Sequence, residues 1–467
     1  MATTSYTIRC LSPVHVGTGA TLSKFDGAYA AGRWHLVDLD RVFAQGVDGE
    51  ELAQAMSVAK FSWAEWLRGR RFTVEQVALY SLPCPQDPGD VAIREGVKNV
   101  YLQPYLPGTT LKGAIRTAIL WHLLRQDARA KEFTRRYLLL ATFAKDIRSE
   151  LHQIARGNRD LEQDPNRQRD AIGRALEEDD LEEREALLQT LYSAMGKDLQ
   201  QARKGNRREC LRMRDFEDLG KDKRLLALPV ERYVFGADPN HDLLRTVQVQ
   251  DSAPTALSNM EVGLVWTYTL RQNQLVPKRE SEGEYKSFAE LLKADSELTT
   301  AIRIDETLFS QQAERELRFA GAKQQAVRQL AQVCNSYAQT LIQHEKAFFT
   351  KYQLAPLRDF YGRLENVLRN APRGAFLLNI GWGGGWEAKT VGDIVREVLQ
   401  DNEYADFEEL RERFQLGANP RTKRIDTSFP FPHTRLIAYR NGAPYSSLGW
   451  VLLKPSSSKP TLHPLAP

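Results

Sequence analysis

The sequence predicts an α+β fold, in which small sheets carry helices on one side. Near both ends of the chain, apolar and polar residues alternate as they do in half-buried strands. Residues 316–352 instead place apolar side chains at helical spacing. Between residues 128 and 228 an acidic block precedes a basic one and β-branched residues are few, which is typical of solvated helices. This region is therefore predicted to be a charged helical insertion.

The individual elements are expected in a definite order. A strand at residues 5–12 is followed by a glycine turn at 13–19 and, from residue 27 to 43, by a hairpin that leads into a helix. A further helix is predicted to begin near Thr109 or Thr110, either of which can cap it. Strands are then expected at 226–236, 243–252, 262–272 and within 429–455, before a loose Ser/Pro-rich tail. The chain is thus divided into residues 1–127, 128–228, 229–310, 311–370 and 371–467.

The composition is that of a globular protein, with 42% hydrophobic and 27% charged residues in a chain of 467. No apolar run reaches the roughly 18 residues of a membrane helix, and the N-terminus lacks the pattern of a signal peptide. We therefore expect a cytoplasmic location and no membrane partner. The four cysteines and eight histidines are scattered, without a CxxC or HExxH motif, so neither a metal site nor another cofactor is expected.

The stretch from Gly381 to Thr390, GWGGGWEAKT, raises the possibility of a phosphate loop. Such a loop requires GxxxxGK(S/T), but counting from Gly383 the second glycine position is occupied by Ala388. No apolar strand ending in an aspartate follows to hold a metal ion. A P-loop NTPase is therefore a disfavoured alternative.

Glycine-rich turns ahead of helices also serve a different purpose, because they expose backbone N–H groups that attract anions. When cations and aromatic residues stand nearby, such turns are suited to single-stranded RNA. The net charge is only +4, but residues 107–136 contain seven Lys or Arg residues against two acidic ones. A local basic stripe of this kind is what an RNA backbone would encounter.

Several stretches of the sequence, taken in their order along the chain, resemble the RAMP superfamily of CRISPR proteins. They are LSPVHVGTG, YLPGTTLKGAIRTAIL, DLLRTVQVQDS, GWGGGWEAKT and FPHTRLIAY with LGWVLLKP. More narrowly, they resemble the type III-A (Csm complex) subunit that caps the 3′ side of the crRNA. The resemblance implies RRM-like, ferredoxin-like domains with a glycine-rich loop, and it leaves the 128–228 insertion uncovered.

The resemblance also implies a function. Such a subunit binds crRNA without cleaving it and is needed for guide maturation and complex assembly in antiviral defence. Its partners would be the crRNA, other type III-A subunits including the backbone RAMP subunit, and target RNA indirectly. The alternative is a RAMP endoribonuclease that processes repeat RNA, for which His15 is the only plausible acid or base near a glycine loop.

Nine residues are candidates for RNA binding: His15, Lys112, Arg116, Arg245, Gly383, Gly384, Gly385, Lys389 and Arg435. Lys112 and Arg116 lie one helical turn apart at a helix start, where they can face one phosphate or form surface ion pairs. Arg245 is expected on a strand edge. His15 alternates with two valines, so a structural role is equally open.

Other aromatic and acidic residues also have two interpretations. Trp382 and Trp386 are either stacking platforms or core residues. Asp26 precedes Gly27 as in a turn, although related RAMP subunits cut target RNA with a loop aspartate. No catalytic residue is expected. Three successive glycines imply positive φ or a close approach, and we expect RNA to be what approaches Gly384.

Overall fold

A computed structural model describes residues 3–143 except 59, 228–400 except 237, 281 and 282, and 406–456 except 420, 421, 423 and 426. Of the predicted charged insertion, residues 144–227 lie outside the described residues, as does most of the Ser/Pro-rich tail. The first part of the insertion, Ala128–Phe143, is a helix.

The strands lie near both ends of the chain and in its middle. They are β1 Thr3–Cys10, β2 Gly17–Leu22, β3 Gly27–Ala30, β4 Arg33–Val37, β5 Ala78–Pro83, β6 Ile93–Gly96, β7 Val247–Val249, β8 Met260–Arg271, β9 Gln274–Pro277, β10 Arg279–Glu280, β11 Gly283–Glu284, β12 Lys286–Leu292, β13 Glu297–Ile304, β14 Phe376–Asn379, β15 Thr434–Arg440, β16 Ala443–Ser446 and β17 Trp450–Pro455.

The helices fall into an N-terminal group and a larger later group. They are α1 Leu39–Ala44, α2 Gly49–Met56, α3 Trp63–Gly69, α4 Val74–Val77, α5 Gly108–Gln126, α6 Ala128–Phe143, α12 Leu228–Phe235, α13 Gln311–Leu317, α14 Ala322–Arg328, α15 Leu330–Lys351, α16 Ala355–Arg369, α17 Gly385–Lys389, α18 Gly392–Leu399 and α19 Phe407–Arg413. Short 3-10 helices include Pro239–His241 and Leu243–Thr246.

One sheet has the ferredoxin-like strand order. Its strands run β14-β17-β1-β13-β7, and each neighbouring pair is antiparallel. Along the chain, β1, α5, β7, β13, α15 and the C-terminal strands follow one another as β-α-β-β-α-β. Numbered in that order, β17, β1, β13 and β7 take the sheet order 4-1-3-2. The predicted α+β, RRM-like class is therefore confirmed.

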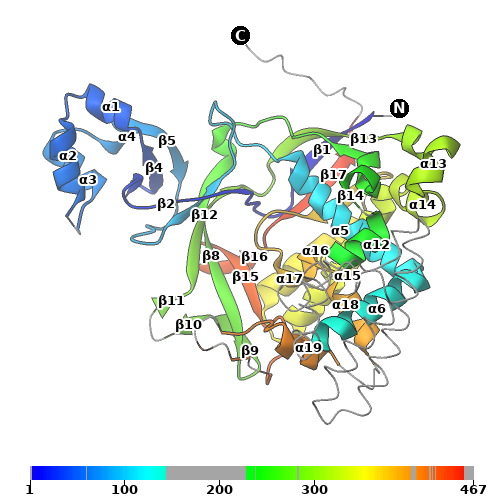
Figure 1. Cartoon of the computed structure of the whole chain (residues 1–467). Coiled ribbons are helices and arrows are strands. Elements are labelled where there is room, and N and C mark those ends of the chain that lie inside the picture. The colour runs from blue at the N-terminus through cyan, green and yellow to red at the C-terminus, as the bar shows by residue number, and fades with distance from the viewer. Residues whose placement is uncertain are drawn as a thin grey trace, which may run out of the picture.

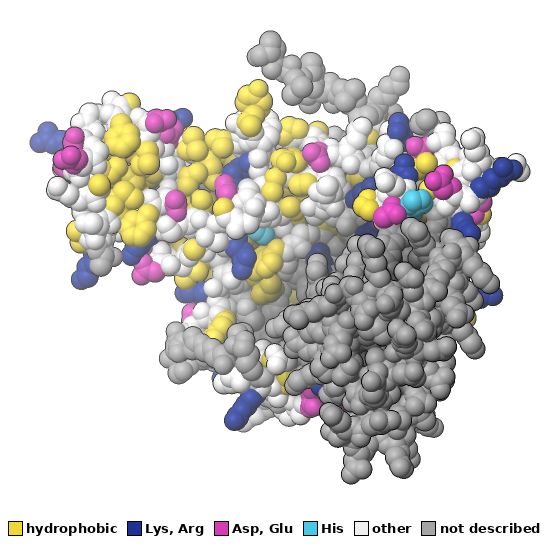
Figure 2. Space-filling view, viewed as in Figure 1, with side chains coloured by type: hydrophobic (Ala, Val, Ile, Leu, Met, Phe, Trp, Pro, Cys, Tyr) yellow, Lys and Arg dark blue, Asp and Glu magenta, His cyan; other side chains and the backbone are white. Residues whose placement is uncertain are grey.

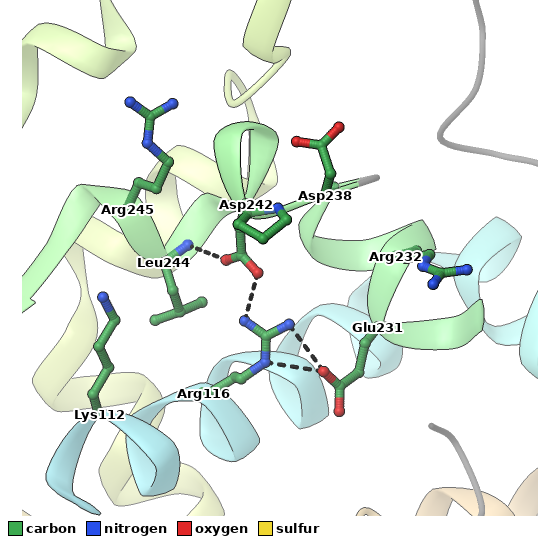
Figure 3. Close-up of a pocket in the computed structure, with 10 residues that line it drawn as sticks. Lys112, Arg116, Glu231, Arg232, Asp238, Asp242, Leu244 and Arg245 are labelled. Carbon is green, nitrogen blue, oxygen red and sulfur yellow. Dashed lines mark hydrogen bonds and ion pairs between the residues drawn. The ribbon is translucent and has the colours of Figure 1, made fainter. Parts of the chain in front are cut away.

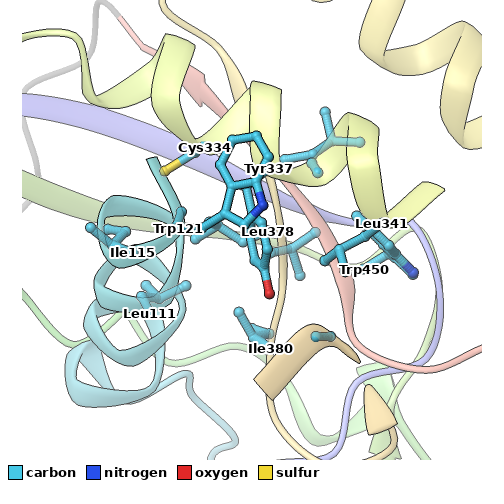
Figure 4. Packing of buried hydrophobic residues seen from close by; sticks show 14 of the residues in the cluster. Leu111, Ile115, Trp121, Cys334, Tyr337, Leu341, Leu378, Ile380 and Trp450 are labelled. Atoms are coloured by element: carbon cyan, nitrogen blue, oxygen red, sulfur yellow. The ribbon is translucent and has the colours of Figure 1, made fainter. Parts of the chain in front are cut away.

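The helices α5 and α15 bury their apolar sides together next to this sheet (Figure 1). Figure 4 shows Leu111 and Ile115 from α5 beside Trp121, and Cys334 and Tyr337 from α15 in the same cluster. These residues recur at helical spacing, so the apolar periodicity of both segments is explained by one shared core.

A second, curved sheet has the order β16-β15-β8-β12-β6-β2, with β9 added beside β8. Strand β2 forms its edge and leads to a small lobe made of β3-β4-β5 and α1 to α4, which projects from the rest of the chain (Figure 1). The lobe has its own apolar cluster, which includes Val42, Trp63 and Leu67. Apolar side chains also gather on its surface (Figure 2), among them Phe25, Leu39, Phe43, Val58 and Leu79.

A buried charged network joins this lobe to the curved sheet. The Glu290 carboxylate on β12 accepts hydrogen bonds from the Tyr80 hydroxyl at 2.6 Å, from the Gly96 N–H at 2.8 Å and from the Lys98 ammonium group. The Glu290 side chain is 0% exposed and that of Lys98 is 5% exposed. Burial, followed by the nearby Glu290 charge, raises the pKa of Tyr80 well above its usual value, so its hydroxyl remains a donor.

Three local predictions were wrong. Residues 228–235 form helix α12 rather than a strand, because Val230 and Val234 both point into the core at an i, i+4 spacing. Strand β2, Gly17–Leu22, begins inside the glycine turn that was expected at residues 13–19. The α5 helix begins at Gly108, whose N–H donates to Asp251 Oδ1 at 2.7 Å, so neither predicted threonine caps it.

Segments from the five predicted parts pair and pack across the predicted boundaries. Strand β1 lies between β13 and β17, which belong to the third and fifth predicted parts. The helix at the start of the predicted insertion, α6, buries Phe133 and Leu138 in the same core as α5. Segments of different predicted parts therefore share one sheet and one core, whereas the small lobe within the first part has a core of its own.

Candidate nucleic-acid interface

The glycine-rich loop connects β14 to α17 and packs closely against the chain on its inner side. Gly381, Gly383 and Gly385 have φ values of +66°, +100° and +71°, in the left-handed region that favours glycine. Gly384 differs, because its φ is −67° and its restriction is steric: a Cβ there would lie 2.1 Å from Asn379 Oδ1. The predicted close approach is thus made by a buried side chain of the same protein, and RNA is not needed to explain this glycine.

The outer side of the loop faces the first turns of α5 across a hollow of about 330 Å³. Thr109, Gly113 and Thr117 lie one turn apart on α5. Their small side chains line this hollow. Lys389 lies opposite them, and its ammonium group has no ion pair within the described residues. Although the residue as a whole is exposed, loss of hydration in the recess lowers the pKa of Lys389 to about 8.

Two further hollows continue along α5. The middle one is lined in part by Thr117, Arg116 and Lys389, and the last, of about 420 Å³, by Lys112, Arg116 and Arg245. Because neighbouring hollows share lining residues, the three follow one side of the helix. We call them together the α5 groove. Its lining residues are Thr109, Thr110, Lys112, Gly113, Ala114, Arg116, Thr117, Leu120, Glu231, Arg232, Gly236, Asp238, Pro239, Asp242, Leu244, Arg245, Gly381, Ala388, Lys389, Thr390 and Val391.

Arg116 is paired inside the protein. Its Nη1 donates to Asp242 at 2.7 Å, and its Nε and Nη2 donate to Glu231 at 3.1 and 2.9 Å. Figure 3 shows this guanidinium group between the two carboxylates, with the Lys112 side chain beside it. Arg116 therefore organises the groove wall, as the ion-pair alternative for this residue describes.

Lys112 and Arg245 are the cations that remain available in this hollow. Lys112 has no ion pair within the described part of the chain, and partial burial is the main cause that lowers its pKa. Arg245 is exposed and donates to the carbonyl oxygen of Asn240. It lies in the 3-10 helix before β7, one turn away from the strand edge where it was predicted.

Two predicted RNA contacts are buried. Arg435 donates from Nε to Glu345 Oε2 at 2.7 Å, and its guanidinium group lies 4.0 Å from the ring centre of Phe348. His15 is 3% exposed and its Nδ1 lies 2.8 Å from the carbonyl oxygen of Glu290. Their internal partners weaken the case for an RNA contact at Arg435 and favour the structural alternative for His15.

The remaining ambiguous residues are also placed by the structure. Asp26 lies in a turn, where its Oδ2 accepts hydrogen bonds from the backbone N–H and hydroxyl of Ser23 at 2.7 and 2.8 Å. Trp386 is half-buried, and it packs against Phe431 and the main core. Trp382 instead lies under the guanidinium group of Arg94, which is 4.7 Å from the ring centre. No sequence motif marked Arg94, because only the pairing of distant strands brings it to the loop.

Comparison with known proteins agrees with this fold. The chain belongs to the RAMP superfamily, whose family model matches residues 7–388. A solved chain in the "Cryo-EM structure of Csm-crRNA-target RNA ternary complex in type III-A CRISPR-Cas system" is 21% identical, with a TM-score of 0.60 over 97% of this chain and 100% of that one. The "Crystal structure of T.onnurineus Csm5" is 19% identical, with a TM-score of 0.52 over 95% and 99%. A comparison with curated proteins finds no match.

Neither a membrane-spanning helix nor a metal-binding cluster is found among the described residues. None of the described helices is both long and apolar enough to cross a bilayer. Among the same residues, no three His, Cys, Asp or Glu side chains are grouped so that they could hold a metal ion.

Proposed function

We propose that this chain is a crRNA-binding, non-catalytic subunit of a type III-A CRISPR ribonucleoprotein. It would cap the 3′ side of the crRNA and be needed for guide maturation and complex assembly. Its partners would be the crRNA and the other subunits, including the backbone RAMP subunit, with target RNA contacted indirectly. Family membership and full-length similarity to a chain of a Csm-crRNA-target RNA complex support this proposal.

The observation that carries the proposal is the α5 groove, where the glycine loop meets the N-terminal turns of a long helix. Lys389 and Lys112 stand in hollows at the two ends of the groove, and neither has an ion pair within the described residues. Threonine and small side chains line the hollow beside Lys389. These two ammonium groups can bind phosphates of a single strand that lies in the groove. The positive end of the α5 dipole adds to their attraction for the phosphates.

Removing both lysines should weaken RNA binding and flatten its salt dependence. Each ammonium group that neutralises a phosphate of a single strand contributes about 0.7 to the log–log slope, so Lys112→Ala with Lys389→Ala should lower the slope by roughly 1 to 1.5. The slope is measured by titrating crRNA into the reconstituted complex at several salt concentrations. Lys351→Ala, which removes an exposed cation on α15 outside the groove, is the matched control. Equal slopes in the double variant and the control would contradict the proposal.

Binding should also weaken as the pH rises through 8. A phosphate binds the protonated ammonium group, so RNA affinity is full below the free-protein pKa of Lys389, about 8, and declines above it. If binding requires this charge, affinity should fall about tenfold between pH 7 and pH 9. Lys389→Arg keeps its charge over the whole range and should remove most of this decline. An equally steep decline in that variant would assign the titration to another group.

The proposal includes no RNA cleavage by this chain. Asp26 is bound to Ser23 in a turn, and His15 is buried, with burial as the main cause that lowers its pKa. We expect Asp26→Ala and His15→Gln complexes to cut target and repeat RNA as the wild-type complex does. Loss of cleavage at one position, with the complex intact on a sizing column, would instead favour the endoribonuclease alternative.

A further inference from the structure

Arg94 and Trp382 form a stacked cation–aromatic pair beside the glycine loop. Arg94 lies on β6 and is exposed, and its guanidinium group lies 4.7 Å from the ring centre of Trp382. It has no ion pair within the described residues. Trp382 follows Gly381, which lines the α5 groove, so the pair adjoins the groove through one peptide unit.

The orientation of the Trp382 indole is fixed by contacts with His15. The backbone N–H of Trp382 donates to the carbonyl oxygen of His15 at 2.8 Å, and the two rings meet edge to face with centres 5.7 Å apart. His15 is itself held by the carbonyl oxygen of Glu290. A platform held by buried groups loses little conformational entropy when a ligand stacks on it.

The surface next to Arg94 is exposed and formed by small residues. The neighbouring strand β2 forms the edge of the curved sheet, and Thr21 lies directly opposite Arg94. The five residues Gly17, Thr18, Gly19, Ala20 and Thr21 are exposed and small. A planar group that lies over the guanidinium would therefore meet no bulky side chain of this strand.

A second cation–aromatic pair on the same sheet differs, because its cation already has a carboxylate partner. Arg440 lies 4.8 Å from the ring centre of Tyr445, but its charge is also paired with Glu261 at 3.4 Å. Arg94 has no carboxylate partner of this kind in the part of the chain that the structure describes. A planar cation on an indole offers both a stacking face and a charge, which matches a nucleobase next to its phosphate.

We propose that the Arg94–Trp382 pair is a nucleobase-stacking site for the RNA strand whose phosphates follow the α5 groove, an inference that rests on the proposed function. The base stacks on the Arg94 guanidinium, which lies on the indole. The groove lysines contribute salt-dependent affinity, and this pair contributes affinity that depends on the presence of a base.

The test compares two labelled probes of equal length, an oligoadenylate RNA and a ribose-phosphate chain without bases, by fluorescence anisotropy with the full chain. Wild-type protein should bind the RNA at least about fivefold more tightly than the abasic chain, the lower range of one stacked base. Arg94→Gln and Trp382→Leu should bring this ratio toward one, while Trp382→Phe retains part of it. Arg440→Gln, the matched control, should keep the wild-type ratio.

The outcomes separate this inference from the proposed function. Lys389→Ala should weaken binding of both probes by a similar factor and leave their ratio unchanged. If wild-type protein binds both probes equally, or if Arg94→Gln keeps the full ratio, the stacking site is overturned while phosphate binding stands. If wild-type protein binds neither probe, the proposed function and this inference fail together. Arg94→Gln removes no buried contact, so its result does not depend on the folding of the tryptophan variants.

Discussion

Replacing Glu290 by alanine is expected to lower the free energy of unfolding by about 3 to 5 kcal/mol, because it leaves a buried charge without a partner. The Lys98 side chain is only 5% exposed, and the carboxylate also accepts hydrogen bonds from Tyr80 and Gly96. The Tyr80 hydroxyl and the Gly96 N–H would lose this acceptor inside the protein, and Lys98 would keep the carbonyl oxygen of Gly96 but lose its counter-charge. The loss is measured by urea unfolding of the full chain.

Two further variants make this prediction specific. Glu306→Ala breaks an ion pair with Arg328 whose side chains are 46% and 52% exposed, and it should change stability little. The double variant Glu290→Leu with Lys98→Met removes both buried charges and should recover much of the lost stability. A loss for Glu290→Ala no larger than that for Glu306→Ala would show that the buried network does not support the fold.

Gly384→Val is expected to lower the melting temperature of the isolated protein. A Cβ at this position would lie 2.1 Å from Asn379 Oδ1 and 3.2 Å from the Cβ of Ala388, so the loop or the buried asparagine must move. Asn379 cannot shift freely, because its Nδ2 donates to the carbonyl oxygen of Leu448 at 2.9 Å. Overpacking of this kind costs about 1 to 3 kcal/mol. Thermal unfolding measures the loss before any RNA is added.

A double-mutant cycle identifies the cause. If Asn379 is the obstacle, combining Gly384→Ala with Asn379→Ala should cost less than the sum of the single changes. Gly362→Ala on α16, where a Cβ would meet no atom within 4 Å, is the control for replacing a glycine. A Gly384→Val protein with wild-type melting but reduced crRNA occupancy would restore the earlier expectation that RNA approaches this glycine.

The sequence alone identified the parts of the chain whose signal is local. Strands β1 and β8 and helices α5 and α15 were predicted, because the spacing of apolar residues along one segment records which side is buried. The glycine loop was also located, because positive φ values restrict residue type wherever they occur, as at Gly383 and Gly385. Helix α12 was predicted as a strand, because its aromatic and β-branched residues favour strands. Its packing against α5 and α6 overrides that preference.

For the candidate RNA-binding residues, too, one part of the answer came from the sequence and another part only from the structure. The sequence determined which cations lie near glycine turns, and with them the superfamily, but it could not determine which cations are already paired. Arg116 is neutralised by residues 115 and 126 positions further along the chain, and Arg94 meets Trp382 only through the curved sheet. Charge is a property of the residue, whereas its availability depends on neighbours brought together by folding. The tertiary structure therefore decided that Lys112, Lys389 and Arg94 have no ion pair within the described residues, while Arg116, Arg435 and His15 contact other groups of the protein.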